Sequence, residues 1–269
     1  AFYSHNIVAN TSKMTSNLFS DLQHKVVLVT GSSSGIGEAI VTLFSQLGAY
    51  VVVTGRNADK VSRVALKCEQ LSPFNYKPLT FVGDLMKDEN IEQLVKQTIE
   101  KHSKIDVLVN NAGSETTLLG ASLLDADFLE KYEKVMRLEV ATRLKICRLT
   151  MPSLIESKGV IINTSSVATK RHEAGFMIHA ISKAAVDMVT KSLALEFGSK
   201  GVRVNSVNPG YVKTTMCDNC SEEEVKNASL FQRMAEAEEI AKTVAFLASN
   251  TSSFVTGITF VADGGWHLK

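Results

Sequence analysis

The stretch TGSSSGIGEAI, Thr30 to Ile40, decides the fold of this chain. It follows the apolar run KVVLVT (25–30) and opens an amphipathic segment, so we expect it to join a buried strand to a helix. Its glycines have the spacing G-x3-G-x-G, which allows a tight turn and a close approach to a pyrophosphate at a helix N-terminus. A flexible turn would also explain the glycines, but the flanking strand and helix favour dinucleotide binding. The residues predicted to bind the pyrophosphate are Gly31, Ser33, Ser34, Gly35, Ile36 and Gly37.

The same alternation of strand and helix continues along the chain. Near-continuous apolar runs are typical of parallel strands covered on both faces, and amphipathic segments separate them here. The alternation predicts right-handed crossovers and a doubly wound parallel sheet, with ligands bound beyond the carboxyl ends of the strands. The predicted strands are 25–30, 50–55, 79–83, 106–111, 159–165, 202–207 and 257–262. The predicted helices are 36–48, 58–71, 88–102, 128–156, 178–198 and 236–249.

Composition argues against several classes of function. The chain has 269 residues, of which 45% are hydrophobic, enough for a large core in a single α/β domain. Its 29 basic and 28 acidic residues leave a formal net charge of +1, which gives no electrostatic reason to expect nucleic acid or a membrane as partner. No apolar run approaches the roughly 18 residues of a transmembrane helix. We expect a cytoplasmic protein.

The N-terminal segment AFYSHNIVANTSK, residues 1–13, precedes Met14. It lacks a basic region followed by an apolar region, so we do not expect a signal peptide. We expect residues 1–13 to be upstream or added sequence. The predicted organisation is an extension without ordered structure at 1–20 and one domain at 21–269.

The four cysteines are Cys68, Cys147, Cys217 and Cys220. A chain that can build a core does not need a disulfide framework. The CxxC within MCDNC lacks a second Cys/His pair for zinc, and no strand-helix context supports a redox motif. We therefore expect no metal site, and we read Cys217 and Cys220 as loop cysteines in a reducing compartment.

Cofactor selectivity is indicated by VVVTGRN (51–57), where the second predicted strand ends. A site for NAD usually has an acidic residue here, on the ribose 2′-hydroxyl. This chain has Arg56, whose guanidinium can bind a 2′-phosphate with two parallel hydrogen bonds. We therefore expect NADP(H) rather than NAD(H), although a solvated surface arginine is the alternative. Asp84, after the third strand, is expected near the adenine amino group.

Six motifs stand in order: TGSSSGIG, NNAG (110–113), NTSS (163–166), HAISK (179–183), NPG (208–210) and TGITFVADGG (256–265). Together they resemble the short-chain dehydrogenase/reductase family in its simple one-domain form, from Asp21 to the C-terminus. The resemblance implies a seven-stranded Rossmann-type sheet with helices on both faces, and a small-molecule carbonyl or alcohol substrate under a lid at about 211–234. It also implies a homodimer or homotetramer, joined by the long helices 128–156 and 178–198 and by the last strand. Further implied cofactor contacts are Asp84, Leu85, Asn111, Ala112, Gly113, Lys183, Pro209, Gly210, Val212 and Thr214.

The family's active site uses Asn, Ser, Tyr and Lys, and this chain departs from that set. In the family the tyrosine transfers the substrate proton and the serine polarises the carbonyl. The lysine binds the nicotinamide ribose and lowers the tyrosine pKa, and the asparagine anchors a relay water. Carried over by position, Ser166 and Lys183 match. The tyrosine position is His179, thirteen residues after Ser166, and the asparagine position is Glu139.

A histidine at this position changes the proton chemistry. Imidazole has a pKa of about 6.5 against about 10 for a phenol, and a cationic neighbour disfavours imidazolium, so we expect a neutral ring at pH 7. Neutral imidazole is a poor donor to an alkoxide but can accept a proton from an alcohol. Glu139 could neutralise Lys183, or stabilise imidazolium in a Glu139–His179–Lys183 relay. Two functions therefore remain open: a slow NADP(H)-dependent oxidoreductase, and a catalytically silent homologue that binds NADP(H).

Overall fold

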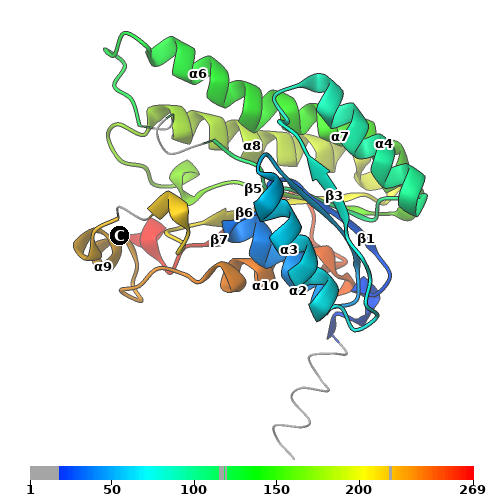
Figure 1. The fold of residues 1–269 in the computed structure, drawn as a ribbon. Coiled ribbons are helices and arrows are strands. Elements are labelled where there is room, and N and C mark those ends of the chain that lie inside the picture. Colours follow the sequence, from blue (N-terminus) through cyan, green and yellow to red (C-terminus); the bar gives the residue numbers. More distant parts are fainter. Residues whose placement is uncertain (1–17, 115–117, 119, 218–219) are drawn as a thin grey trace, which may run out of the picture.

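The computed structural model describes residues 18–114, 118, 120–217 and 220–269, arranged as helices on both sides of a sheet (Figure 1). Within these residues, seven parallel strands pair in the order β3-β2-β1-β4-β5-β6-β7. This confirms the predicted α/β class: a single Rossmann-type, doubly wound domain with a seven-stranded parallel sheet. The strands are β1 (Val26–Val29), β2 (Tyr50–Gly55), β3 (Leu79–Val82), β4 (Val107–Asn110), β5 (Val160–Thr164), β6 (Arg203–Pro209) and β7 (Thr259–Ala262).

Helices cover both faces of the sheet, as predicted. They are α2 (Gly35–Gln46), α3 (Ala58–Leu71), α4 (Asp88–His102), α6 (Phe128–Met136), α7 (Thr142–Ser157), α8 (Met177–Phe197), α9 (Glu222–Ala228) and α10 (Ala237–Ala248). Helices α2, α3 and α10 lie on one side of the sheet, and α4, α7 and α8 lie on the other (Figure 1). The strand order reverses between β1 and β4, and a ligand of such a sheet binds beyond the strand ends at this point.

The central strand β1 is buried on both faces because its side chains alternate between two core clusters. Val27 and Val29 pack in one cluster with Phe44 of α2. Leu28 packs in the other, with Ile146 of α7. The apolar run KVVLVT thus anchors the two helix layers to one strand. The loop that follows it is held at the carboxyl edge of the sheet.

The segment 128–156, predicted as one helix, contains a wider turn. Between α6 and α7 the backbone forms a π-helical turn, η2 (Arg137–Ala141). This turn carries Glu139, whose side chain is 1% exposed. Turns of this kind are frequent at functional sites. Hydrophobic spacing does not reveal the wider turn, because two of the groups that bind the Glu139 carboxylate, Ser114 and Lys183, come from other parts of the chain.

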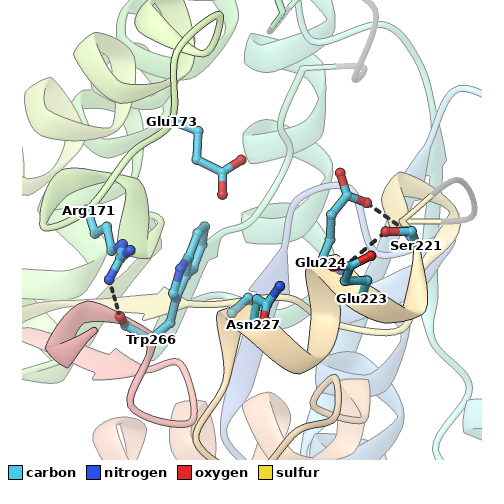
Figure 2. A pocket seen from close by; sticks show the side chains of 8 residues that line it. Arg171, Glu173, Ser221, Glu223, Glu224, Asn227 and Trp266 are labelled. Atoms are coloured by element: carbon cyan, nitrogen blue, oxygen red, sulfur yellow. Dashed lines mark hydrogen bonds between the residues drawn. The ribbon is translucent and has the colours of Figure 1, made fainter.

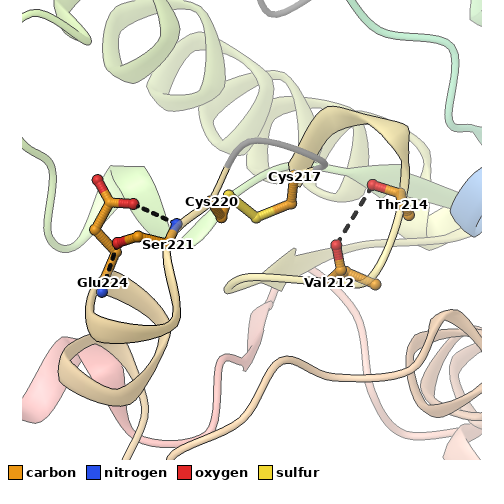
Figure 3. The surroundings of a disulfide bond; sticks show 6 residues. All are labelled: Val212, Thr214, Cys217, Cys220, Ser221 and Glu224. Carbon is orange, nitrogen blue, oxygen red and sulfur yellow. Dashed lines mark hydrogen bonds between the residues drawn. A yellow bond between two sulfur atoms is a disulfide. The ribbon is translucent and has the colours of Figure 1, made fainter.

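The prediction that Cys217 and Cys220 are unpaired loop cysteines is wrong, because the structure joins them in a disulfide (Figure 3). A short 3₁₀ turn, η5 (Thr215–Cys217), brings their Cα atoms to 5.0 Å, a separation that a disulfide spans. Ser221 then caps α9: its hydroxyl accepts from the backbone N–H of Glu224 at 3.2 Å, and the Glu224 carboxylate accepts from Ser221 N–H at 2.7 Å. Disulfide and cap together fix the start of α9.

The other two cysteines, Cys68 and Cys147, are buried free thiols, and burial raises the pKa of each to about 11.

Among the described residues, no group of three or more His, Cys, Asp or Glu side chains is placed to hold a metal ion. No helix in the same part of the chain is long and apolar enough to cross a membrane.

Residues 1–17, which include the whole segment 1–13, lie outside the described residues. The described chain begins with a short 3₁₀ turn, η1 (Ser20–Leu22), directly before β1. Leu22 is buried in the core cluster of α2, and Phe19 packs against that cluster. The folded part of the chain therefore extends to Phe19, within the predicted extension 1–20.

Candidate active site

The glycine-rich loop between β1 and α2 is tied to the segment after β4. Gly31 has φ +64°, a conformation that favours glycine. At Gly37 an added Cβ would lie 2.3 Å from the carbonyl oxygen of Gly31, so a larger residue would force the loop open. The side chain of Asn111 is hydrogen-bonded to this loop: its Nδ2 donates to the carbonyls of Thr30 at 3.1 Å and Gly31 at 3.2 Å. The two segments predicted to bind the cofactor therefore meet.

The N-terminus of α2 fits a pyrophosphate. Ser34 precedes the helix without a capping hydrogen bond from its side chain, so first-turn N–H groups keep their donor capacity. Thr214 faces the start of this helix, where a Cβ added to Gly35 would lie 3.2 Å from Thr214 Cγ2. The loop predicted for the nicotinamide end and the loop predicted for the phosphates thus border the same space. The residues present fit a dinucleotide.

The segment after β6 contains the remaining residues predicted at the nicotinamide end. Pro209 ends the strand, and the N–H of Gly210 donates to the carbonyl of Ala262 at 3.2 Å. Val212 is buried and pairs with Ala235 in an isolated parallel bridge. These backbone pairings place the segment at the carboxyl edge of the sheet.

At the adenosine end, Arg56 directly follows β2 and is exposed. Asp84 follows β3, where its Oδ1 accepts from the N–H of Met86 at 2.9 Å, and Leu85 beside it is buried. Sequence reasoning missed Arg63 of α3, whose guanidinium lies near the glycine-rich loop.

Arg63 Nη2 donates to the carbonyl of Ser33 at 3.5 Å and pairs with Glu38 at 2.6 Å. The Arg63 guanidinium, against partial burial, lowers the pKa of Glu38. No sequence motif marks Arg63, because its relation to the loop exists only in the fold.

Glu139 is the centre of a buried charge cluster. Its Oε2 accepts hydrogen bonds from Lys183 Nζ and from Arg143 Nη2, each at 2.8 Å. Its Oε1 accepts from the N–H of Ser114 at 3.0 Å. Of the two roles considered for this carboxylate, the structure shows direct pairing with Lys183. Arg143, the second cation, was not singled out by the sequence.

These contacts decide the ionisation of the cluster. Burial disfavours the Glu139 carboxylate, but the charges of Lys183 and Arg143 outweigh it and lower the pKa of Glu139 to about 2. Burial also lowers the pKa of Lys183, against the opposing effect of Glu139. The carboxylate is therefore ionised at pH 7.

His179 lies on α8 one turn before Lys183, on the same face of the helix. Its ring is half-buried, and its buried Nδ1 has no hydrogen-bond partner among the described residues. Burial, followed by the charge of Lys183, lowers the pKa of His179 to about 4; the carboxylate of Glu139 opposes this only in part. The ring is neutral at pH 7, as the sequence analysis expects, and a carboxylate-stabilised imidazolium is disfavoured.

Ser166 stands at the carboxyl end of β5, where two neighbours hold its backbone and side chain. Its Oγ accepts from the N–H of Ala168 at 3.1 Å, and Asn208 Nδ2 donates to its carbonyl at 3.0 Å. Lys183 Nζ reaches the same strand end, 3.4 Å from the carbonyl of Thr164. The fold therefore brings the end of β5 and Lys183 together. Tyr211, which follows the NPG motif, packs against Trp266 with ring centroids 5.0 Å apart.

A cavity of about 380 Å³ lies between α9 and the loop that follows β5 (Figure 2). Arg171 donates to the carbonyl of Trp266 across one end of it, and Glu173 points into it (Figure 2). Part of its wall comes from the predicted lid, 211–234, and the rest comes from Arg171, Glu173 and Trp266, which were not predicted as site residues. The lining residues are Arg171, Glu173, Ser221, Glu223, Glu224, Asn227, Ala228 and Trp266.

Comparison with known proteins places this arrangement in a family. Residues 31–267 match the sequence model of a family described as enoyl-(acyl carrier protein) reductase. A glucose 1-dehydrogenase of Gluconobacter oxydans is 34% identical over 251 residues, which cover 91% of this chain and 92% of that protein. The chain belongs to the short-chain dehydrogenase/reductase family. A 3-oxoacyl-[acyl-carrier-protein] reductase FabG of Thermotoga maritima is another relative, 33% identical over 91% of this chain and 98% of its own length.

Solved structures of short-chain dehydrogenases/reductases share the fold. One from Mycobacterium marinum superposes with a TM-score of 0.85 and 28% identity, covering 93% of this chain and 98% of its own. The L-sorbose reductase of Gluconobacter frateurii, solved with NADPH and L-sorbose, has a TM-score of 0.84 and 27% identity, covering 92% of this chain and 98% of its own. Relatives of this short-chain dehydrogenase/reductase are thus oxidoreductases of small molecules and acyl-carrier substrates.

Proposed function

We propose that this protein interconverts a carbonyl and a secondary alcohol with NADP(H), and does so slowly because His179 stands at the proton-transfer position. The buried ammonium of Lys183, 2.8 Å from Glu139 and beside the end of β5, carries the proposal. Buried ion pairs are often less stabilising than apolar residues of similar volume. Keeping such a cluster at the cofactor end of the sheet favours retained use over drift.

Lys183, Ser166, His179 and the Asn111–Gly113 loop each have a role in the proposed reaction. NADP(H), when bound, supplies or accepts the hydride. The Lys183 ammonium holds the nicotinamide ribose, and the Ser166 hydroxyl donates to the substrate oxygen. His179 gives or takes the proton at that oxygen. The Asn111–Gly113 loop contacts the adenosine ribose.

We also propose a homodimer or homotetramer formed through α7 and α8, with segment 211–234 as a substrate lid. Helix α8 exposes Ile181, Met188 and Leu195 at intervals of seven residues, which places them along one face. On α7, Leu144 and Leu149 are also exposed. Apolar surface of this extent on two adjacent helices supports association with another copy.

The alternative is a silent homologue that binds NADP(H) without turnover. The low pKa of His179 favours this alternative, since a neutral ring donates a proton poorly. Its Nδ1 also has no hydrogen-bond partner in the part of the chain that the structure describes. Fluorescence titration with NADPH, followed by NADPH consumption against a panel of aldehydes and ketones, separates the two. Binding with slow turnover supports the oxidoreductase, and binding without turnover supports the silent homologue. A protein that binds no NADPH contradicts both.

The pH dependence of the reaction gives a test of His179. Reduction needs the imidazolium as donor, and with a pKa of about 4 only about one ring in 10³ is protonated at pH 7. We expect kcat/KM for reduction to rise about tenfold per pH unit from pH 7 to pH 5. Oxidation, which uses the neutral ring, should vary little over that range. Product is measured by chromatography; a flat reduction profile would exclude His179 as donor.

The Arg56→Asp exchange tests cofactor selectivity. Loss of a two-pronged, charge-assisted contact with the 2′-phosphate should raise the Kd for NADPH by about 10–100-fold. NADH lacks this phosphate, so its Kd should stay within about threefold. Fluorescence titration with both cofactors measures the two values on one sample. An equal change for both would show that Arg56 does not read the phosphate.

A further inference from the structure

Arg143 is a buried guanidinium to which neither the motifs nor the proposed reaction gives a role. It lies on α7, one turn after Glu139, and its side chain is 3% exposed. Nη2 donates to Glu139 Oε2 at 2.8 Å and to the carbonyl of Ala112 at 2.9 Å. Nη1 donates to the carbonyl of Asn110 at the end of β4. One side chain thus links the carboxylate to the loop predicted to hold the adenosine ribose.

The charges of the cluster suggest why the guanidinium is there. Glu139, Lys183 and Arg143 together carry a net charge of +1. The family pattern, a lysine beside a neutral asparagine, carries the same charge. A glutamate alone at the asparagine position would cancel the ammonium of Lys183. The second cation restores the balance.

We propose that Arg143 is a positioning residue that offsets the charge of Glu139, so that Lys183 presents an effective ammonium to the nicotinamide ribose. In the same position it ties the 110–113 loop to the charge cluster. The proposal rests on the proposed NADP(H) function. It adds that Glu139 and Arg143 work as a pair, which neither residue implies alone.

The hydrogen bonds of Arg143 fit a planar guanidinium with several donors better than a single ammonium. The guanidinium donates to the Glu139 carboxylate and to two backbone carbonyls: that of Asn110, the last residue of β4, and that of Ala112, two residues later. A lysine ammonium at the end of a flexible stem does not match such planar, divergent acceptors. By sharing Oε2 with Lys183, the guanidinium leaves Oε1 for the N–H of Ser114. All three segments around the carboxylate are then fixed relative to one another.

The groups that face Lys183 define an electrostatic test. Glu139 approaches from η2 and Arg143 from α7, while Asp187 and the neutral His179 share α8 with it. Burial lowers the pKa of Lys183, Glu139 and Asp187 raise it, and Arg143 lowers it. Removing the Glu139 charge therefore lowers this pKa, and removing the Arg143 charge raises it. Removing both returns it toward the wild-type value.

The experiment is a double-mutant cycle of Glu139→Gln, Arg143→Met and the double variant, read by NADPH titration from pH 6 to pH 10. Binding should weaken as pH rises through the pKa of Lys183. We expect this midpoint to fall in Glu139→Gln, to rise in Arg143→Met and to lie near wild type in the double variant. At pH 7 Arg143→Met should raise the Kd at least tenfold, because Glu139 then cancels the ammonium of Lys183. Adding Glu139→Gln to Arg143→Met should recover most of this loss.

Arg143→Lys and Lys145→Met serve as comparison variants. Arg143→Lys keeps the positive charge, so the pH midpoint of NADPH binding should stay at the wild-type value, although the hydrogen bonds of the guanidinium are lost. The second removes a cation from the surface of the same helix, where Lys145 pairs with Glu92 at 2.8 Å, and should change neither Kd nor midpoint. Unmoved midpoints in the single variants, or additive changes in Kd, would show a merely structural arginine and overturn the proposal.

Thermal unfolding of the same variants keeps this result separate from the proposed function. If the wild-type protein does not bind NADPH, the proposed function fails. The Tm values of Glu139→Gln, Arg143→Met and the double variant then still show whether Glu139 and Arg143 act as a unit. We expect the double variant to lose less Tm than the two single variants together. Additive losses of Tm would overturn the pairing.

Discussion

His179→Tyr is expected to raise kcat/KM for carbonyl reduction with NADPH at pH 7 by about 10²–10⁴-fold, the effect of a positioned general acid. The wild-type ring has its pKa lowered to about 4 by burial and by Lys183, so it lacks a proton to give at neutral pH. A phenol keeps its proton up to about pH 10 in water. The same buried ammonium that suppresses imidazolium would stabilise a developing phenolate.

His179→Phe is the matched control, since it fills the position without a titratable group. Its rate should stay at or below that of wild type, with an unchanged Kd for NADPH. Equal gains in Phe and Tyr variants would trace the effect to packing. Comparable rates in wild type and His179→Tyr would instead show that the histidine works as well as the phenol, and the view of an impaired site would be abandoned.

Glu139→Gln is expected to reduce turnover at least tenfold and to destabilise the fold by about 3–5 kcal/mol, because Lys183 and Arg143 stay buried without their counter-charge. For a domain of this size such a loss corresponds to a fall in Tm of roughly 10 °C. Differential scanning fluorimetry and urea unfolding measure it. Glu130→Gln, which breaks the exposed pair with Lys134, should change stability by less than about 1 kcal/mol. Similar losses in the two variants would refute the buried cluster as a stabilising element. Unchanged turnover in Glu139→Gln would show that the carboxylate does not support the reaction.

The contribution of Glu139 to the stability of the fold should depend on pH in the acid range. The pKa of Glu139 is about 2 in the folded chain, against about 4.3 for a free glutamate. Its contribution to stability is therefore complete above the unfolded pKa and declines as pH falls toward 2. Urea unfolding of wild type and Glu139→Gln should show a constant difference from pH 5 to pH 7 and a smaller one at pH 3. A difference that stays the same at pH 3 would contradict the assignment.

Much of the candidate site could be proposed from the sequence because its residues either follow a strand or lie on a helix at a fixed spacing from one. The spacing from Ser166 to Lys183 was enough to propose His179 as a site residue, since these residues lie on one strand end and one helix. Glu139 was found in the same way, by its place in the long segment 128–156. Arg143 was not found, because an arginine four residues along an amphipathic helix resembles any solvated cation.

By itself the sequence determined the succession of seven strands along the chain, the helices that separate them, and the glycine-rich turn. These features depend on local periodicity and on spacing along the chain, which any reader of the sequence can measure. Only the tertiary structure decided the partners of Glu139, the π-helical turn that carries it, and the bond between Cys217 and Cys220. The charge balance at Glu139 depends on how deeply groups from separate elements are buried together, and burial at such a junction is not a property of any one segment.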